Sequence, residues 1–354
     1  MDAFPELLFS LTVQCTILLL AARFLVSRQT SHEEMDSLWS SCHAAILLLC
    51  VLGVSFPHLR LWTEEFYYAS ASAVAFGSWP RVLFVVWVSG VIVLSTGIVA
   101  SLIRTTLLVR NSVLLDPDMR PWIAPEVPLN VRLLQSSRIS TPFCWQLHKP
   151  LIILPTSVLT FPHNELQAII RHEYAHLQAG HPLRLFLQRL VEVVFWFHPL
   201  VWTFSRHAAL ERELVSDQIA ANNREAALSL LRGLWRVASN GTKPTVDLPA
   251  GLSFGAGGEM LNRRVDVLVE NAGRPCDNSN HSTLSARGIF VAAAVAAMIW
   301  LPLNPHATSR SWFSPWPSGS ALFLQELGLP VRDYEVDARL LQDKQQELQE
   351  TSHD

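Results

Sequence analysis

The stretch that decides the fold runs from Val82 to Ile103 and reads VLFVVWVSGVIVLSTGIVASLI. It contains no Asp, Glu, Lys or Arg. A helix that crosses a bilayer needs about 20 mostly apolar residues, and this stretch satisfies that length. The sequence therefore predicts a membrane-spanning helix over 82–103.

Three further stretches approach the same length and polarity, at 7–26, 38–56 and 287–304. Arg23 is the one charge in the first of them and lies near its end, whereas Pro302 is expected to end the last helix early. The first stretch is not preceded by basic residues, so we expect it to remain as a span rather than to be cleaved as a signal peptide. The prediction is about four transmembrane helices.

The composition agrees with a membrane protein. Of 354 residues, 50% are hydrophobic and 16% are charged, against about 25% charged in an average soluble domain. The net charge of −3 gives no basic excess to neutralise phosphates, which argues against a nucleic-acid-binding protein. Cysteine is present five times, an odd number without zinc-ribbon spacing, and free or buried thiols are expected.

Arginines near the spans predict the orientation, because cytoplasmic loops carry an excess of Lys and Arg. Arg23 and Arg28 flank the first loop, and Arg104 and Arg110 follow the third span. We therefore expect three transmembrane helices in residues 1–104, a cytoplasmic domain over 105–286, a fourth span over 287–304 and a short extracytoplasmic tail over 305–354.

The large insert at 105–286 has ordinary polarity and can form a folded core. Runs of aliphatic residues predict extended segments at 127–134 and 150–159. Helical periodicity predicts helices at 164–179, at 183–205 with a break at Pro199, and at 206–221, 224–239 and 261–270. The fold class expected is a mainly α membrane protein with an inserted α+β domain.

Residues 171–176 read Arg-His-Glu-Tyr-Ala-His and contain the pattern HExxH. On a helix, His172 and His176 lie one turn apart on the same face, so that their imidazoles can share one tetrahedral zinc ion. Glu173 lies beside them, where it can accept a proton from an attacking water. Zinc is the cofactor that this spacing predicts.

A third ligand is expected on a later helix, where residues 210–217 read LERELVSD. Glu213 and Asp217 fall on one helical face, so Glu213 can bind the metal while Asp217 accepts a hydrogen bond from the outer N–H of a histidine ligand. Glu211 is the rival ligand, although it lies about 200° around the helix from Glu213.

Four runs together resemble the membrane metallopeptidases of the BlaR/MecR type: PLIILP at 150–155, HEYAH at 172–176, FWFHPLVW at 195–202 and LERELVSD at 210–217. The resemblance covers about residues 1–305. It implies a multi-pass protein of the bacterial inner membrane with a gluzincin-like protease domain. It also implies that His172, His176 and Glu213 bind zinc and that Glu173 is the catalytic residue.

The chain departs from that family pattern in several places. Gln146 stands where glycine is expected, His181 where an acidic residue is usual, and His198 where asparagine is common. The two histidines raise the question of additional metal contacts, against the simpler interpretation that they are core or solvated residues. The tail at 305–354 is short for a penicillin-binding sensor domain, so direct sensing of a beta-lactam is not expected.

The function predicted is a zinc-dependent endopeptidase that cleaves a regulatory protein, such as a transcriptional repressor, or itself in a signalling response. Its partners would be a protein substrate and the lipid bilayer. Residues 151–154 are a candidate strand for holding an extended substrate, and His207 is a candidate for stabilising the oxyanion. Two alternatives stay open: a membrane quality-control protease of the HtpX type, and a noncatalytic signalling scaffold.

Overall fold

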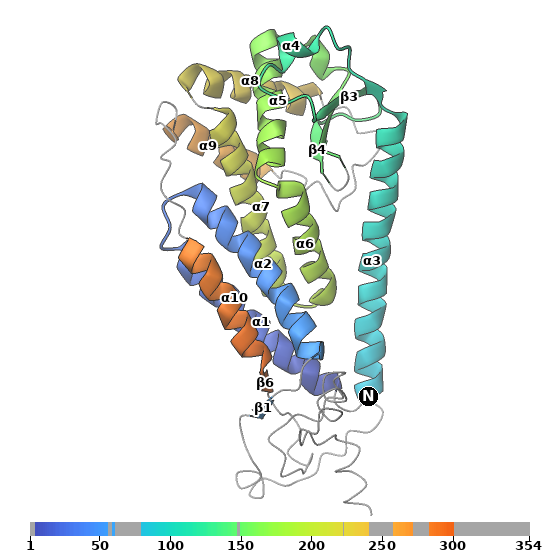
Figure 1. Ribbon diagram of the computed structural model, residues 1–354, viewed down its shortest axis with the longest axis vertical. Helices are drawn as coiled ribbons and strands as arrows, with labels where there is room; N and C mark the ends of the chain where they lie inside the picture. Colours follow the sequence, from blue (N-terminus) through green and yellow to red (C-terminus); the bar gives the residue numbers. More distant parts are fainter. Residues whose placement is uncertain are drawn as a thin grey trace, which may run out of the picture. The chain divides into compact units, whose positions relative to one another are not determined.

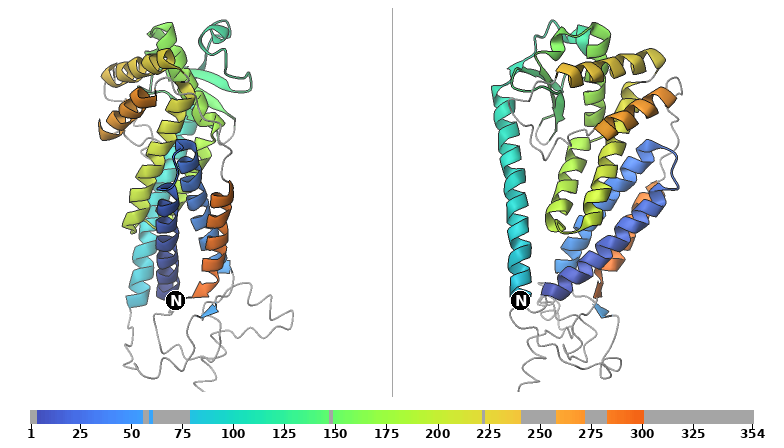
Figure 2. Two further views of the ribbon diagram at one scale, coloured as in Figure 1. Left: turned by 90° about the vertical axis from the view of Figure 1, so that its left-hand side faces the viewer. Right: turned by 180° about the vertical axis from the view of Figure 1, so that it is seen from behind.

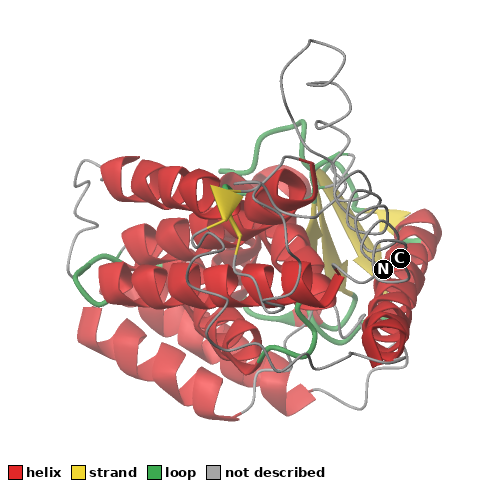
Figure 3. Ribbon diagram, turned by 90° about the horizontal axis from the view of Figure 1, so that it is seen from below, coloured by secondary structure: helices red, strands yellow, loops and turns green. Residues whose placement is uncertain are grey.

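The computed structural model describes residues 4–55, 59–60, 79–146, 149–221, 223–240, 258–271 and 283–300. Helices make up most of the described chain, as Figure 3 shows, and the strands are short. The chain divides into two compact units. The described residues of the first fall within 1–24, 41–91 and 283–354, and those of the second within 25–40 and 92–282.

Among the described residues, three helices are long and apolar enough to cross a membrane. They are contained in α1 (Phe4–Val26), α2 (His32–Ser55) and α3 (Trp79–Asn111), and the candidate spans are Leu7–Val26, His32–Ser55 and Arg81–Asn111. The three spans predicted at 7–26, 38–56 and 82–103 coincide with these helices. Both α2 and α3 are longer than the predicted apolar stretches, because polar turns extend α2 at its start and α3 at its end.

Helix α3 is one continuous element in both views of Figure 2. Its 33 residues give a length of about 50 Å, which exceeds the roughly 30 Å of bilayer hydrocarbon. Many large apolar side chains along it are exposed, among them Val85, Val93 and Val99. Such a surface fits lipid, and the surplus length explains how the last turns of α3 reach the folded domain, where Leu108 is buried.

The predicted fourth span is only partly described. Helix α10 (Thr283–Ala297) contains an apolar segment, Arg287–Ala297, that is too short to cross a bilayer as it stands. Two short strands, β1 (Leu59–Arg60) and β6 (Ile299–Trp300), pair in parallel. The Gln14 amide on α1 donates to the carbonyls of Ala296 at 2.7 Å and of Ile299 at 2.6 Å, which satisfies orphan groups at the end of α10. Residues 301–304 and the predicted tail 305–354 lie outside the described residues.

The second unit contains a four-stranded mixed sheet of order β2-β3-β5-β4. The strands are β2 (Val113–Leu114), β3 (Arg132–Ser136), β4 (Phe143–Trp145) and β5 (Leu151–Pro155), and β3 pairs with β5 in parallel while the other pairs are antiparallel. Every residue of β5 is buried. Each such aliphatic side chain contributes about 1.5–3 kcal/mol by leaving water, so β5 forms the centre of the domain core.

The extended segment predicted at 150–159 contains β5 but continues into turns after Pro155, and the prediction for 127–134 is wrong over its first part. Residues 127–131 form turns, in which the Val131 N–H donates to the Pro128 carbonyl at 3.0 Å. Pro128 has no N–H to give to a strand and Asn130 favours turns, so the strand starts only at Arg132. The short strands β2 and β4 were not predicted. Before β3 lies a single helical turn, α4 (Arg120–Ile123), and after β5 lies a 3₁₀ turn, η3 (Val158–Thr160).

The helices of the second unit are α5 (His163–Gln178), α6 (His181–Val194), α7 (Pro199–Ala220), α8 (Arg224–Asn240) and α9 (Gly258–Asn271). The prediction of α5, α8 and α9 is confirmed. The predicted break at Pro199 is confirmed as well, but the separate helix expected from residue 206 is wrong, because α7 is continuous from Pro199. A proline is tolerated as the first residue of a helix and disfavoured within one.

Helix α5 is the central helix of this unit. It packs against α7 and α8, and it lies beside both in Figure 1. Its buried residues Leu166, Ile169 and Ile170 join Ile152 and Leu154 of β5 in one hydrophobic cluster. Because α5 is fixed against both the sheet and α7, its side chains can be positioned precisely relative to those of α7.

The four cysteines within the described residues are free thiols, as expected. They are Cys15, Cys42, Cys50 and Cys144. Cys276 lies outside the described residues.

Candidate metal centre

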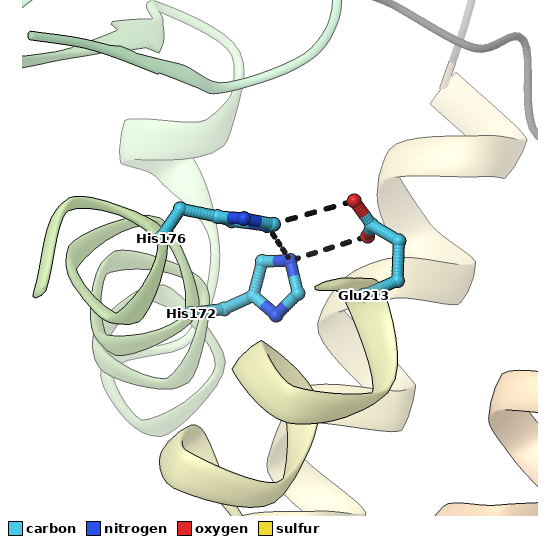
Figure 4. Close-up of side chains that lie close together, drawn as sticks. All are labelled: His172, His176 and Glu213. Atoms are coloured by element: carbon cyan, nitrogen blue, oxygen red, sulfur yellow. Dashed lines mark hydrogen bonds and ion pairs between the residues drawn. The ribbon is translucent and has the colours of Figure 1, made fainter. Parts of the chain in front are cut away.

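Helix α5 holds His172 and His176 on one face, as the HExxH spacing predicts. Their Nε2 atoms lie 3.1 Å apart, and the two rings meet edge to face. Figure 4 shows both rings directed toward α7. This places two imidazole nitrogens at one point between α5 and α7.

Glu213 on α7 completes the cluster. Its Oε2 lies 3.5 Å from His172 Nε2, and its Oε1 lies 3.6 Å from His176 Nε2. One ligand atom from each of the three residues lies within 4.8 Å of the others, as the dashed lines in Figure 4 indicate. A tetrahedral ion bound at about 2.0–2.2 Å holds its ligand atoms about 3.3 Å apart, so these separations suit such an ion.

The other nitrogen of His172 faces Asp217, one turn after Glu213 on α7. Nδ1 of His172 lies 2.9 Å from Asp217 Oδ1. A carboxylate only accepts hydrogen bonds, so the proton of a neutral His172 lies on Nδ1 and its Nε2 keeps a lone pair. Metal-binding histidines are oriented in this way by carboxylates.

Arg264 on α9 is a residue of this site that the sequence analysis missed. Its Nε and Nη2 each lie 2.7 Å from an oxygen of Asp217, and its Nη1 lies 2.9 Å from Glu213 Oε2. Arg264 lies on the buried face of α9 together with Leu268, whereas the adjacent Arg263 is exposed. Glu213 and Asp217 could have indicated that such a residue exists, because two neighbouring buried carboxylates need a cation close to them.

The two histidines differ in their affinity for protons. Burial disfavours a charged His172, yet Asp217 and Glu213 outweigh that effect and raise its pKa to about 10. Burial lowers the pKa of His176 well below its ordinary value, and Glu213 only partly opposes this shift. Burial also lowers the pKa of His181. The cluster therefore attracts one positive charge, and a metal ion would compete with a proton for it.

Glu173 lines a cavity of about 390 Å³ together with the three clustered residues. Burial raises the pKa of Glu173 to about 7, with His172 opposing and Glu213 adding to the shift. Carboxyl groups whose pKa lies near the working pH are suited to accept and return a proton. Glu173 thus lies in the cavity beside the clustered residues.

Cys144 on β4 also lines the cavity. Burial, with the nearby Glu173 and Glu213, raises the pKa of this thiol well above its ordinary value. A thiol is a strong nucleophile only as a thiolate. Cys144 therefore does not suit a cysteine-protease mechanism at this cavity.

Other candidates from the sequence lie elsewhere or have other partners. Glu211, the rival ligand, is paired with His32 at 2.7 Å. His207 stacks near Trp39 and Phe204 and is not among the residues that line the cavity.

The two histidines at unusual positions differ. His181 lines the cavity and contacts His176, with their Nδ1 atoms 2.7 Å apart, so it touches a member of the cluster without joining it. His198 is buried and precedes the first turn of α7. Gln146, the third departure, follows β4.

The prediction that residues 151–154 hold a substrate strand is wrong. These residues form β5, which is paired on one side with β3 and on the other with β4. The edge strands of the sheet are β2 and β4, and all three residues of β4 line the cavity.

Comparisons with known proteins relate this chain to a peptidase family. A family model described as BlaR1 peptidase M56 matches residues 7–227. The regulatory protein BlaR1 of Bacillus licheniformis is 29% identical over 140 residues, which are 39% of this chain and 23% of that protein. The regulatory protein BlaR1 of Staphylococcus aureus is 25% identical over 145 residues, 39% of this chain and 25% of that protein.

The matched segment thus spans about a quarter of the length of these two relatives. The family model covers far more of this chain, including α1 to α7 with all three clustered residues. With its apolar helices and its possible His/Glu metal site, the chain is a membrane protein that belongs to the BlaR1 peptidase M56 family of metallopeptidases.

Proposed function

We propose that this chain is a zinc-dependent endopeptidase of the bacterial cytoplasmic membrane. One observation carries the proposal: His172 Nε2, His176 Nε2 and a Glu213 oxygen converge on one point beside the cavity. Three electron-pair donors at such short range repel one another unless a proton or a metal ion lies between them. Two imidazoles and one carboxylate are a donor set that catalytic zinc uses, with a fourth position open.

The chemistry of each residue follows from its place. Zinc held by His172, His176 and Glu213 would supply Lewis acidity toward the attacking water and the scissile carbonyl. Glu173 accepts a proton from the attacking water and returns it to the leaving nitrogen. Asp217 orients His172, and Arg264 holds both Asp217 and Glu213 in place.

The substrate binds, in this proposal, as an extended peptide along β4. An edge strand has unpaired backbone groups that can pair with another strand, and Phe143, Cys144 and Trp145 all line the cavity. A peptide paired with β4 would pass close to Glu173 and the metal residues.

The membrane setting suggests the class of substrate. Four spans, with residues 105–286 on the cytoplasmic side and 305–354 outside, would give the catalytic domain access to cytoplasmic proteins. The two relatives are named as regulatory proteins, which favours a regulatory substrate such as a repressor, or self-cleavage, over general membrane quality control. A noncatalytic scaffold would have no need for a complete ligand set with Glu173 beside it.

The experiment uses the full chain in detergent and its Glu173→Gln variant. Metal analysis should find about one zinc ion per chain in both proteins. Cleavage of a mixture of quenched fluorescent peptides should fall at least about 100-fold in the variant, since general-base catalysis contributes that much or more. Equal cleavage by both proteins, or no bound zinc in either, would reject the proposal.

Comparison of cleaved proteins in cells that carry the wild type or Glu173→Gln separates the alternatives. One or a few cleaved cytoplasmic regulators would support signalling, whereas many cleaved membrane proteins would indicate quality control. A signalling phenotype that persists unchanged in the variant would indicate a scaffold.

A further inference from the structure

The outer nitrogens of the two metal histidines have different partners. Nδ1 of His172 faces the carboxylate of Asp217. Nδ1 of His176 instead lies 2.7 Å from Nδ1 of His181, the first residue of α6. A hydrogen bond between two ring nitrogens needs one donor and one acceptor, so the direction depends on what else His181 contacts.

The other nitrogen of His181 faces a carboxylate. Its Nε2 lies 3.4 Å from Oδ2 of Asp36 on α2, and Arg184 pairs with the same oxygen. Asp36 is 1% exposed and His181 is 3% exposed, so water does not compete for either group. Residues 25–40 and α6 belong to the same compact unit.

One placement of protons satisfies all of these contacts. A carboxylate is an acceptor only, so the His181 nitrogen that faces Asp36 at 3.4 Å, Nε2, is the one that carries the proton, and Nδ1 keeps a lone pair. The Ser216 hydroxyl, 3.3 Å from that Nδ1, can donate to it as well. His176 must then donate from its own Nδ1, which leaves its Nε2 free to bind a metal.

The opposite placement, with the proton of His181 on Nδ1, is unfavourable both at Asp36 and at His176. If His181 donated from Nδ1, its Nε2 lone pair would face the Asp36 carboxylate. His176 would then carry its proton on Nε2, the atom that approaches His172 and Glu213, and could not bind a metal through that atom.

We propose that Asp36 and His181 form a positioning relay that fixes the proton and the ring orientation of His176 and so raises the affinity for zinc. This inference rests on the proposed function. The ring of His181 lies between His176 and the carboxylate of Asp36. His172, in contrast, contacts the carboxylate of Asp217 directly. Because Asp36 comes from α2, this helix becomes part of the support of the metal site.

The relay is tested by zinc affinity, measured by competition with a chelator, and by the absorption spectrum of the cobalt-substituted full chain. Partners of this kind contribute about 10–100-fold in metal affinity, so Asp36→Ala should weaken zinc binding about tenfold and alter the cobalt spectrum. Glu34→Ala removes a neighbouring carboxylate of α2 and is the matched control, with no change expected.

The double variant Asp36→Ala/His181→Asp is the decisive test. An aspartate oxygen occupies the same place along its side chain as Nδ1 does in histidine, so the carboxylate at position 181 would accept directly from His176. The total charge of the two positions is kept. We expect the double variant to recover most of the zinc affinity that Asp36→Ala loses, whereas purely structural damage would not be repaired by a second change.

The outcomes separate this inference from the proposed function. A folded Asp36→Ala variant with wild-type zinc affinity, or a double variant that recovers none, overturns the relay while the zinc site stands. If Asp36→Ala does not fold, His181→Leu decides, and unchanged zinc affinity in that variant overturns the relay. A wild-type chain that binds no zinc rejects the proposed function itself.

Discussion

Replacement of Asp217 by Asn tests whether the metal residues depend on the buried charges behind them. Asp217 is 1% exposed and meets Arg264 with both oxygens at 2.7 Å. An amide keeps one oxygen, but its NH2 group would face a donor of Arg264. Breaking a buried ion pair costs about 3–5 kcal/mol of unfolding free energy.

The same change acts on zinc through His172. A neutral amide is a weaker acceptor for the His172 Nδ1 proton than the carboxylate 2.9 Å away, so the ring becomes a poorer ligand. We expect the zinc dissociation constant of Asp217→Asn to rise about 10–100-fold. The assay is chelator competition on the full chain, alongside denaturation of the metal-free protein.

Glu165 provides the matched control on α5. It is also buried and is paired with an arginine, since Arg236 Nε lies 2.7 Å from its Oε2, but it is not among the metal cluster. Glu165→Gln should lower stability and leave zinc affinity unchanged. The reasoning is refuted if Asp217→Asn binds zinc as the wild type does, or if Glu165→Gln weakens zinc binding equally.

Two further outcomes follow from contacts on α7 and α8. Glu213→Gln should abolish stoichiometric zinc binding while Glu211→Gln, two positions away and paired with His32, should retain it; metal analysis after dialysis decides, and equal zinc contents would contradict the ligand assignment. Gly233→Ala should lower thermal stability by about 1 kcal/mol, because overpacking costs about 1–3 kcal/mol and the helix propensity of Ala returns about 1. Its Cβ would lie 3.0 Å from Ile169 Cδ1, and a stability equal to or above that of the wild type would show that Ile169 moves aside freely.

The features that the sequence predicted best are local and periodic. Helix α5 was found almost to the residue, because its apolar positions recur at helical spacing and Gly180 ends it. His172 and His176 share a face for the same reason. The one-turn spacing of Glu213 and Asp217 predicted that both lie on one helical face. In the structure, both carboxylates lie close to His172.

The features that the sequence did not predict depend on long-range packing. Arg264 reaches the site from α9, 47 positions after Asp217. Its spacing from Leu261 and Leu268 puts it on the apolar face of α9, unlike Arg263, but no local pattern shows that this face meets α7. Asp36 lies in the polar start of α2, outside the apolar stretch by which that span was recognised. The strand β4 is too short to show a period, so the substrate strand was predicted at the more apolar residues 151–154 of β5.

Gly180 limits which sequence changes this chain could tolerate near the candidate metal centre. It is the one residue with positive φ within the described chain, at 68°, between the last turn of α5 and the first of α6. A side chain would meet nothing within 4 Å there, so space does not require glycine, but a left-handed backbone costs other residues about 1–2 kcal/mol. A variant that relaxed this turn would retain His176 and His181 in its sequence yet separate their rings, so an intact HExxH pattern alone would not guarantee a working enzyme.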